Sequence, residues 1–159
     1  MFTLRCTARL RKRLGTTEET ASTPPSTRLG DWYAHLVFTR PQLVLCVSER
    51  TLLPVPIPAR EGSLLVSRLR EAVGQMLRAL RIGEEAVAAE EAEMMDAVIG
   101  KTVSRQVLGS MNDFVRMLDS YRGTGTLLEV SLHLAETPCG PLRMNSPREE
   151  TIRVFALPT

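Results

Sequence analysis

The sequence predicts an α+β fold, with a single domain, a largely antiparallel sheet of four to five strands and helices packed mainly on one face. Two observations predict it. Residues 31–57 contain three short strand-like runs separated by turns, as expected of antiparallel hairpins. From Ser63 onward the apolar residues follow the 3.6-residue period of helices instead. The chain of 159 residues fits one domain, residues 1–159, and its 43% apolar content is enough to form a core.

The chain begins with a predicted strand over residues 2–6, followed by a brief basic helix. Thr7 is placed to cap this helix, and Gly15 is placed to end it, because glycine readily adopts the left-handed conformation that closes helices. Residues 16–30 are rich in Ser and Thr and contain two adjacent prolines. This composition predicts a flexible loop within the domain.

Three strands are predicted next, over residues 31–39, 43–47 and 51–57. The first alternates between two faces. The second, LVLCV, is apolar on both faces, which suits a central strand that is covered on each side. In the third, Pro54 and Pro56 are two residues apart, so their backbone nitrogens face the same edge of the strand. Because proline has no N–H, that edge lacks donors at both positions. This pattern predicts an edge strand.

Two helices are predicted to follow, one from Ser63 until Gly83 and an acidic one over residues 84–96. Two glutamates lie in the first turn of the acidic helix, where the helix dipole favours negative charge. Residues 98–100 form a short strand or a bend.

The helix predicted over residues 104–121 is the most strongly patterned element, and Ser104 is placed to act as its N-cap. Its apolar residues form one helical stripe: Val107, Leu108, Met111, Phe114, Val115, Leu118 and Tyr121. Beyond it, residues 127–135 alternate between apolar and polar positions and predict a strand. Residues 151–157 are a candidate for the last strand.

Residues that packing alone does not require surround the helix over 104–121. Lys101 and Arg105 flank its start, where free N–H groups attract anions. A glycine inside a helix costs about 1 kcal/mol relative to alanine, so Gly109 suggests the close approach of another backbone or a ligand. Asn112 and Asp113 are poor helix formers at mid-helix. The alternative to a site is purely structural: the charged residues face solvent, and Gly109 allows close packing against a neighbouring element. The candidate site for a ligand or partner comprises Lys101, Arg105, Gly109, Asn112, Asp113 and Trp32.

Two glycine-containing motifs do not indicate nucleotide binding. The sequence GKT at residues 100–102 lacks the first glycine of a phosphate-binding loop, because Met95 occupies that position. The sequence GTG at residues 123–125 joins a predicted helix to a predicted strand. The dinucleotide-binding fingerprint requires the reverse order.

Cys139 and His133 are the candidates for a nucleophile and its base. Such a pair needs direct hydrogen-bond contact and an oxyanion site, and the sequence alone does not bring the two residues together. His35 and His133 show no metal-ligand spacing. We therefore expect neither a metal nor a cofactor.

Charge is distributed unevenly along the chain, although the net charge is only +2. Residues 1–14 contain five basic residues and no acidic one, whereas residues 83–100 contain six acidic residues and no basic one. No helix-turn-helix, zinc-finger or aromatic RNA-binding signature accompanies the basic segment. A solvated basic face, or pairing of the two segments within the fold or across a homodimer, is the alternative to nucleic-acid binding. The candidate nucleic-acid contacts are Arg9, Arg11, Lys12 and Arg13.

The three cysteines, Cys6, Cys46 and Cys139, are odd in number and show no CxxC spacing, which favours a reduced protein. No apolar run approaches the roughly 20 residues of a membrane-spanning helix. The basic N-terminal residues precede no hydrophobic signal region. We therefore expect a cytoplasmic protein with no membrane contact.

Four segments of the chain resemble a family of small bacterial proteins known only as a domain of unknown function. They are LGDWYAHLVF (29–38), LVLCVSERTLLPV (43–55), GKTVSRQVLGSMNDF (100–114) and LAETPCGPL (134–142). The resemblance extends from residue 2 to about residue 147. It implies a bacterial cytosolic protein with one complete domain, and it implies no activity or ligand.

Three hypotheses for function follow. The first is a binding or interaction module, regulatory or associated with nucleic acid, whose partner is a protein or a nucleic acid. The second is an enzyme with a cleft at the helix over 104–121, in which Asp113 or His133 acts as acid or base. It predicts that Asp113, Arg105 and one of Trp32, Tyr33 or His133 converge. The third is a structural homodimer in which the acidic helix meets the basic helix of a partner.

Overall fold

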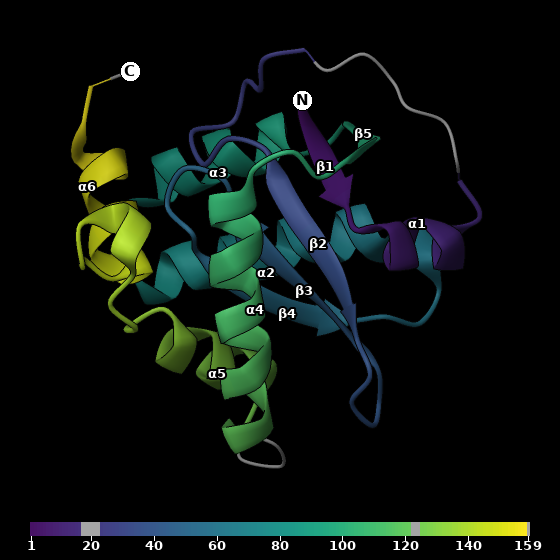
Figure 1. Ribbon diagram of the computed structural model, residues 1–159. Helices are drawn as coiled ribbons and strands as arrows, with labels where there is room; N and C mark the ends of the chain where they lie inside the picture. Colours follow the sequence, from purple (N-terminus) through teal and green to yellow (C-terminus); the bar gives the residue numbers. More distant parts are fainter. Residues whose placement is uncertain (17–22, 122–124, 159) are drawn as a thin grey trace.

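A computed structural model describes residues 1–16, 23–121 and 125–158 of the protein. Its strands form a five-stranded mixed sheet in the order β4-β3-β2-β1-β5 (Figure 1). The strands β2, β3 and β4 pair in antiparallel fashion, whereas β1 pairs in parallel with both β2 and β5. The strand bounds are β1 Phe2–Cys6, β2 Trp32–Val37, β3 Leu43–Ser48, β4 Pro54–Pro58 and β5 Ala97–Lys101.

Six α-helices surround the sheet in the described part of the chain. Their bounds are α1 Ala8–Leu14, α2 Leu65–Ala79, α3 Glu84–Glu93, α4 Arg105–Leu118, α5 Leu127–Leu134 and α6 Pro147–Ala156. Together with the sheet they confirm the α+β class. None of the helices in the described residues is both long and apolar enough to cross a membrane.

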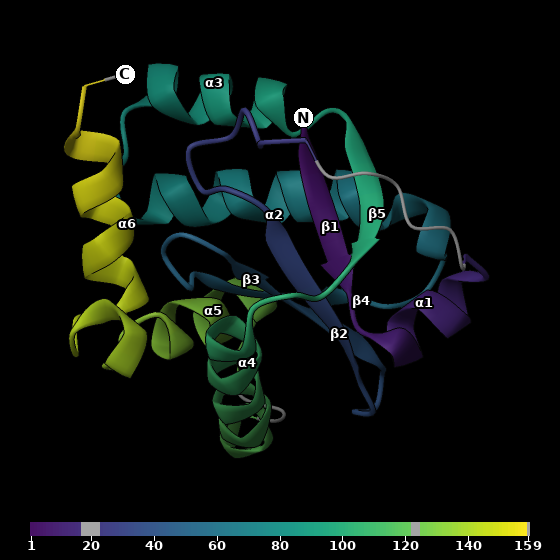
Figure 2. The same ribbon diagram turned by 45° about the horizontal axis from the view of Figure 1, so that its top comes forward.

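The helices divide between the two faces of the sheet, rather than gathering mainly on one as the sequence suggested. The strand β3 shows why, because its side chains are buried on both sides. Val44 and Cys46 belong to one core, with α2 and α3, and Leu45 and Val47 belong to the other, with α4 and α5. Figure 2 shows α2 and α4 on opposite sides of the sheet. The doubly apolar LVLCV segment correctly predicted a strand that is covered on both faces.

Several local predictions are confirmed. Gly15 follows α1 in the left-handed conformation at φ 73°. Thr7 occupies the N-cap position, but its side chain makes no capping hydrogen bond; its hydroxyl contacts His35 instead, at 3.0 Å. The strand β4 is an edge strand, as its prolines predicted. Residues 98–100 are part of a strand, β5, at the opposite edge of the sheet.

Two segments predicted as strands, residues 127–135 and 151–157, are helical instead and correspond to α5 and most of α6. The reason lies one residue before each helix. The side chains of Thr126 and Ser146 accept hydrogen bonds from the backbone N–H three residues later, and a glutamate occupies that later position in both cases. At Ser146 the glutamate side chain also accepts from the backbone N–H of Ser146, which completes a capping box, whereas Thr126 acts as an N-cap alone. The capping residues therefore decide the structure where the alternating pattern is ambiguous.

Part of the predicted loop over residues 16–30 lies outside the described residues, which exclude 17–22. The remainder is irregular but tightly held. The buried carboxylate of Glu90 on α3 accepts hydrogen bonds from the backbone N–H of Arg28, at 2.7 Å, and of Leu29, at 3.1 Å. Ser48 donates to the Leu29 carbonyl at 2.7 Å. Burial raises the pKa of Glu90, although these hydrogen bonds oppose that shift.

Candidate functional site

The helix α4 is anchored to the sheet at its first turn, as expected for an element that organises a site. The Ser104 hydroxyl accepts a hydrogen bond from Val107 N at 3.2 Å and so caps the helix. Ser104 N in turn donates to the hydroxyl of the buried Tyr33 on β2, at 2.9 Å. The predicted N-cap and the buried apolar stripe of this helix are both confirmed.

The structure does not bring the residues predicted around α4 together. Arg105, Asn112 and Asp113 are exposed along the helix, as is Lys101 at the end of β5. The expected close approach of another backbone at Gly109 is wrong, because a Cβ added there would meet no protein atom within 4 Å.

Trp32 is not part of a site at α4 either. It is completely buried in the core beneath α2, on the face of the sheet opposite α4. Strand alternation explains this placement, because it sends Trp32 and its neighbour Tyr33 to opposite faces. Tyr33, and not Trp32, faces α4.

An open cavity of about 350 Å³ lies between α4 and residues 137–141. Ser110, Asp113 and Cys139 are among the residues that line it. Burial raises the pKa of the Cys139 thiol, and the nearby Asp113 carboxylate raises that pKa further. A nucleophilic cysteine needs the opposite shift, because the thiolate is the reactive form. The Cys139 thiol donates instead to the Thr137 carbonyl at 3.4 Å.

The second candidate for covalent chemistry, His133, lies on α5 rather than on a strand, and its ring stacks on Tyr121 at a centroid distance of 5.3 Å. The convergence predicted by the enzyme hypothesis is therefore not observed. Asp113 lines the cavity beside Cys139, Arg105 lies two turns earlier on α4, and Trp32 lies across the sheet. Among the described residues, no group of three or more His, Cys, Asp or Glu side chains could hold a metal ion.

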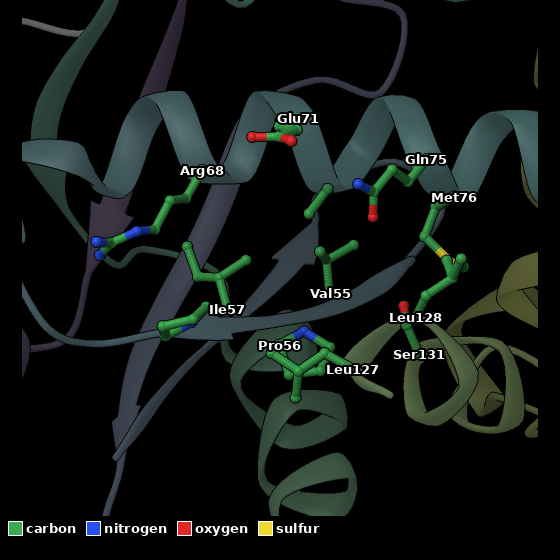
Figure 3. A pocket seen from close by; sticks show the side chains of 12 residues that line it. Val55, Pro56, Ile57, Arg68, Glu71, Gln75, Met76, Leu127, Leu128 and Ser131 are labelled. Carbon is green, nitrogen blue, oxygen red and sulfur yellow. The ribbon is translucent and has the colours of Figure 1, made fainter. Parts of the chain in front are cut away.

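A second concave feature, of about 230 Å³, lies between α2, α5 and the free edge of β4. Figure 3 shows Val55 and Ile57 of β4 directed toward α2, and Gln75 of α2 directed toward the strand. The Pro54 carbonyl points away from β3, because it accepts a hydrogen bond from Ser131 on α5. The carbonyls of Pro56 and Pro58, two and four residues further along β4, point away from β3 as well. The edge thus presents acceptors and no N–H donors, which opposes the pairing of another strand.

Basic side chains gather where the parallel strands β1 and β5 finish. The strand register places Cys6 opposite Lys101 on one side and opposite Ala34 on the other, so α1 starts beside the end of β5 (Figure 2). Arg5 donates to the Lys101 carbonyl at 3.2 Å and forms an ion pair with Asp31 at 3.3 Å. We call this surface the basic end and define it as Arg5, Arg9, Arg11, Lys12, Arg13, Arg40 and Lys101.

The helix α1 runs along the far half of β2 toward the turn that joins β2 to β3. Thr7 contacts His35 at 3.0 Å, and Arg13 donates to Gln42 at 2.7 Å. Burial and the nearby charge of Arg9 lower the pKa of His35. The guanidinium of Arg9 lies 5.0 Å from the ring centroid of Phe38, which is 58% exposed. The basic end therefore contains a solvent-facing aromatic ring with a cation over one face.

The acidic helix α3 already has a basic partner within the chain. Arg78 of α2 contacts both Glu84 and Glu91 at 2.8 Å. Arg28 and Arg50 lie close to the buried Glu90. Glu93, the last residue of α3, pairs with the N-terminal ammonium of Met1 at 3.6 Å. Four of the glutamates of α3 thus interact within the fold, and the homodimer stays a prediction.

Sequence reasoning missed the joining of α1 to the ends of β5 and β2. Each segment carried a visible basic signal, but only the parallel pairing of β1 with β5 brings them together.

Comparison with known proteins gives a family and no activity. No curated protein and no solved structure matches the chain. Residues 3–150 match the model of one family, described as a domain of unknown function (DUF6933). The match covers most of the sequence, as the resemblance in its GKT and VLGSMNDF segments led us to expect. The protein therefore belongs to the DUF6933 family.

Proposed function

We propose that the protein is a binding module that holds single-stranded nucleic acid at the basic end. The observation that carries this proposal is a separation of charge. Residues 1–16, 31–43 and 97–104 meet at this end and contain seven Lys or Arg and one acidic residue, Asp31, which is paired with Arg5. Subtracting these from the 20 basic and 18 acidic residues of the chain leaves 13 basic against 17 acidic residues. The basic end is therefore strongly positive on a protein whose remainder is negative.

Phosphate groups suit this surface because each basic side chain that contacts a phosphate releases a condensed counterion, which favours binding. Lys12 and Arg40 form no side-chain hydrogen bond or ion pair with the described residues, so both are available to an external anion. Asp31 already neutralises Arg5, which leaves Arg5 a structural role.

The exposed ring of Phe38 favours a single strand over a duplex. Unpaired bases stack on aromatic side chains and on arginine planes, at about 1–3 kcal/mol per stacked base. Arg9 already lies over this ring. The bases of a duplex are stacked on one another and are not offered to such a ring.

A bacterial cytoplasmic setting is part of this proposal. The three cysteines are free and buried, and burial raises the pKa of Cys6 to about 12, which keeps the thiol protonated and unreactive. These features support a reducing compartment.

The test is fluorescence anisotropy with labelled 20-nucleotide DNA and RNA, single-stranded and duplex, at about 0.1 M salt, where the Debye length is about 10 Å. We expect saturable binding to the single strands. The double variant Lys12→Gln/Arg40→Gln should bind at least about tenfold more weakly, because two phosphate contacts are lost. Phe38→Ala should weaken binding to single strands and leave any duplex binding unchanged.

The matched control is Arg116→Gln/Arg148→Gln, which removes the same charge from exposed positions on α4 and α6. It should retain wild-type affinity within about twofold. At the salt concentration of the assay, charges that lie more than a Debye length from the bound oligonucleotide are largely screened. Equal losses in both double variants, or no saturable binding to any oligonucleotide, would contradict the proposal.

A further inference from the structure

A cluster of arginines surrounds an open cavity of about 560 Å³ that is far from the basic end. Glu150 and Arg153 of α6 line the cavity, and α6 lies on the opposite side of the molecule from α1 (Figure 1). Three cationic side chains and one carboxylate line it, together with an apolar wall at Leu142. The charged residues are Arg50, Arg143, Arg153 and Glu150.

The three arginines come from separate parts of the chain, and two of them are already held in place. Arg50, which follows β3, uses one terminal nitrogen to donate to the carbonyls of Thr27 and Arg28, at 3.1 and 3.2 Å. Arg153 on α6 holds Glu150 through two hydrogen bonds, including one at 3.1 Å from Nε. That carboxylate is therefore neutralised by one of the three cations. The cavity keeps a net charge of about +2, counted from these four side chains.

Arg143 differs from the other two because its side chain forms no hydrogen bond or ion pair with the described residues. Its backbone and that of Met144 both adopt the left-handed conformation, at φ 55° and 68°. Such residues cost about 1–3 kcal/mol each when they are not glycine. The turn is held by hydrogen bonds from Met144 N to the Cys139 carbonyl, at 2.9 Å, and from Cys139 N to the Asn145 carbonyl, at 3.1 Å. These bonds hold the backbone of Arg143 at the wall of the cavity.

We propose that this cavity binds the phosphate group of a small phosphorylated molecule. Arginines from three segments of the chain line the cavity, and guanidinium groups suit a tetrahedral dianion, whose oxygens accept hydrogen bonds from several directions. The volume lies within the range of small-molecule sites and exceeds what a phosphate alone would fill. The apolar surface of Leu142 is available to the organic part of the ligand. This inference is independent of nucleic-acid binding at the basic end, because it rests on different residues.

The experiment is isothermal titration calorimetry at low ionic strength with phenyl phosphate, and with benzoate as the carboxylate alternative. We expect binding of phenyl phosphate, with benzoate at least about tenfold weaker because it carries one charge fewer. The variant Arg143→Asn removes the cation while keeping a residue that tolerates the left-handed conformation. It should weaken phenyl phosphate binding by about tenfold or more, as expected when a charge-assisted contact is lost.

The matched control is Arg81→Asn. Arg81 is also an exposed arginine in the left-handed conformation, at φ 63°, and it does not line the cavity. This variant should bind phenyl phosphate as wild type does, and so should Lys12→Gln/Arg40→Gln, which separates the two proposed sites. No measurable heat up to about 10 mM phenyl phosphate, equal losses in the two asparagine variants, or benzoate binding as tight as that of phenyl phosphate would overturn the inference.

Discussion

The buried carboxylate of Glu90 gives the sharpest test of how this fold is held together. Glu90 is 2% exposed, and its two oxygens accept separate hydrogen bonds from the backbone N–H groups of Arg28 and Leu29. The variant Glu90→Ala leaves both groups buried without an acceptor. Each such loss costs about 1–3 kcal/mol, so the free energy of unfolding should fall by roughly 2–6 kcal/mol. Glu90→Gln keeps one acceptor and should lose about half as much.

The assay is urea unfolding followed by circular dichroism and by the fluorescence of Trp32. This residue is the only tryptophan and is completely buried, so its emission reports on the same core. The control is the neighbouring Glu91→Ala, which removes a partly exposed carboxylate that contacts Arg78. Such an exposed pair contributes at most about 1 kcal/mol. A Glu90→Ala variant as stable as Glu91→Ala would refute the account of how residues 26–30 are fixed.

Three further predictions concern pH, capping and the anchor of α4. Because burial raises the folded-state pKa of Glu90 above its ordinary 4.5, its favourable contribution is fully present below that value and is lost as pH rises through the raised pKa. The stability advantage of wild type over Glu90→Gln should therefore shrink as the pH rises above 4.5 in urea titrations. An advantage that grows with pH would show the opposite shift. Ser146→Ala removes the capping box of α6 and should lower the free energy of unfolding by about 0.5–2 kcal/mol. Ser146→Asp should keep most of the wild-type stability, because aspartate also caps helices. A Ser146→Ala variant as stable as wild type would contradict the capping role. Tyr33→Phe leaves Ser104 N without its acceptor and should cost about 1–3 kcal/mol, with faster hydrogen exchange in the first turn of α4; unchanged exchange there would exclude the anchor.

The sequence predicts elements well where one pattern is unambiguous. The stripe of α4 repeats over four turns, and Ser104 caps it, so period and cap agree. The prolines of β4 identify the edge of the sheet because a proline cannot donate to a neighbouring strand. In both cases local chemistry and tertiary position impose the same requirement, and the local signal is sufficient.

The prediction fails where an alternating pattern competes with a helix signal. Residues 127–134 alternate like a strand, yet Val130 and Leu134 also lie on one helical face, and the Thr126 hydroxyl caps the helix by accepting a hydrogen bond from Glu129 N. The same capping signal at Ser146 starts α6. Short apolar runs are ambiguous by period alone, and the capping residues, which the prediction left unweighed, resolve the ambiguity.

The candidate site was less accessible to prediction because it depends on pairing between distant strands. Lys101 and the basic residues of α1 are separated by nearly 90 residues of sequence, and the parallel register of β1 with β5 joins them. Trp32 was misplaced for a related reason. An alternating strand defines two faces, but only the packing of α2 and α4 decides which face holds which helix.

The central proposal is that the basic end contacts phosphates, and the most direct test is the salt dependence of binding to a single-stranded oligonucleotide. Anisotropy titrations across a salt series give the slope of the logarithm of the binding constant against the logarithm of the salt concentration. Each phosphate contact contributes about 0.7 to this slope for single strands, so removing two contacts in Lys12→Gln/Arg40→Gln should reduce its magnitude by about 1.4. The Arg116→Gln/Arg148→Gln control should keep the wild-type slope. A wild-type affinity that does not change with salt, or a slope that is the same in all three proteins, would contradict the proposal.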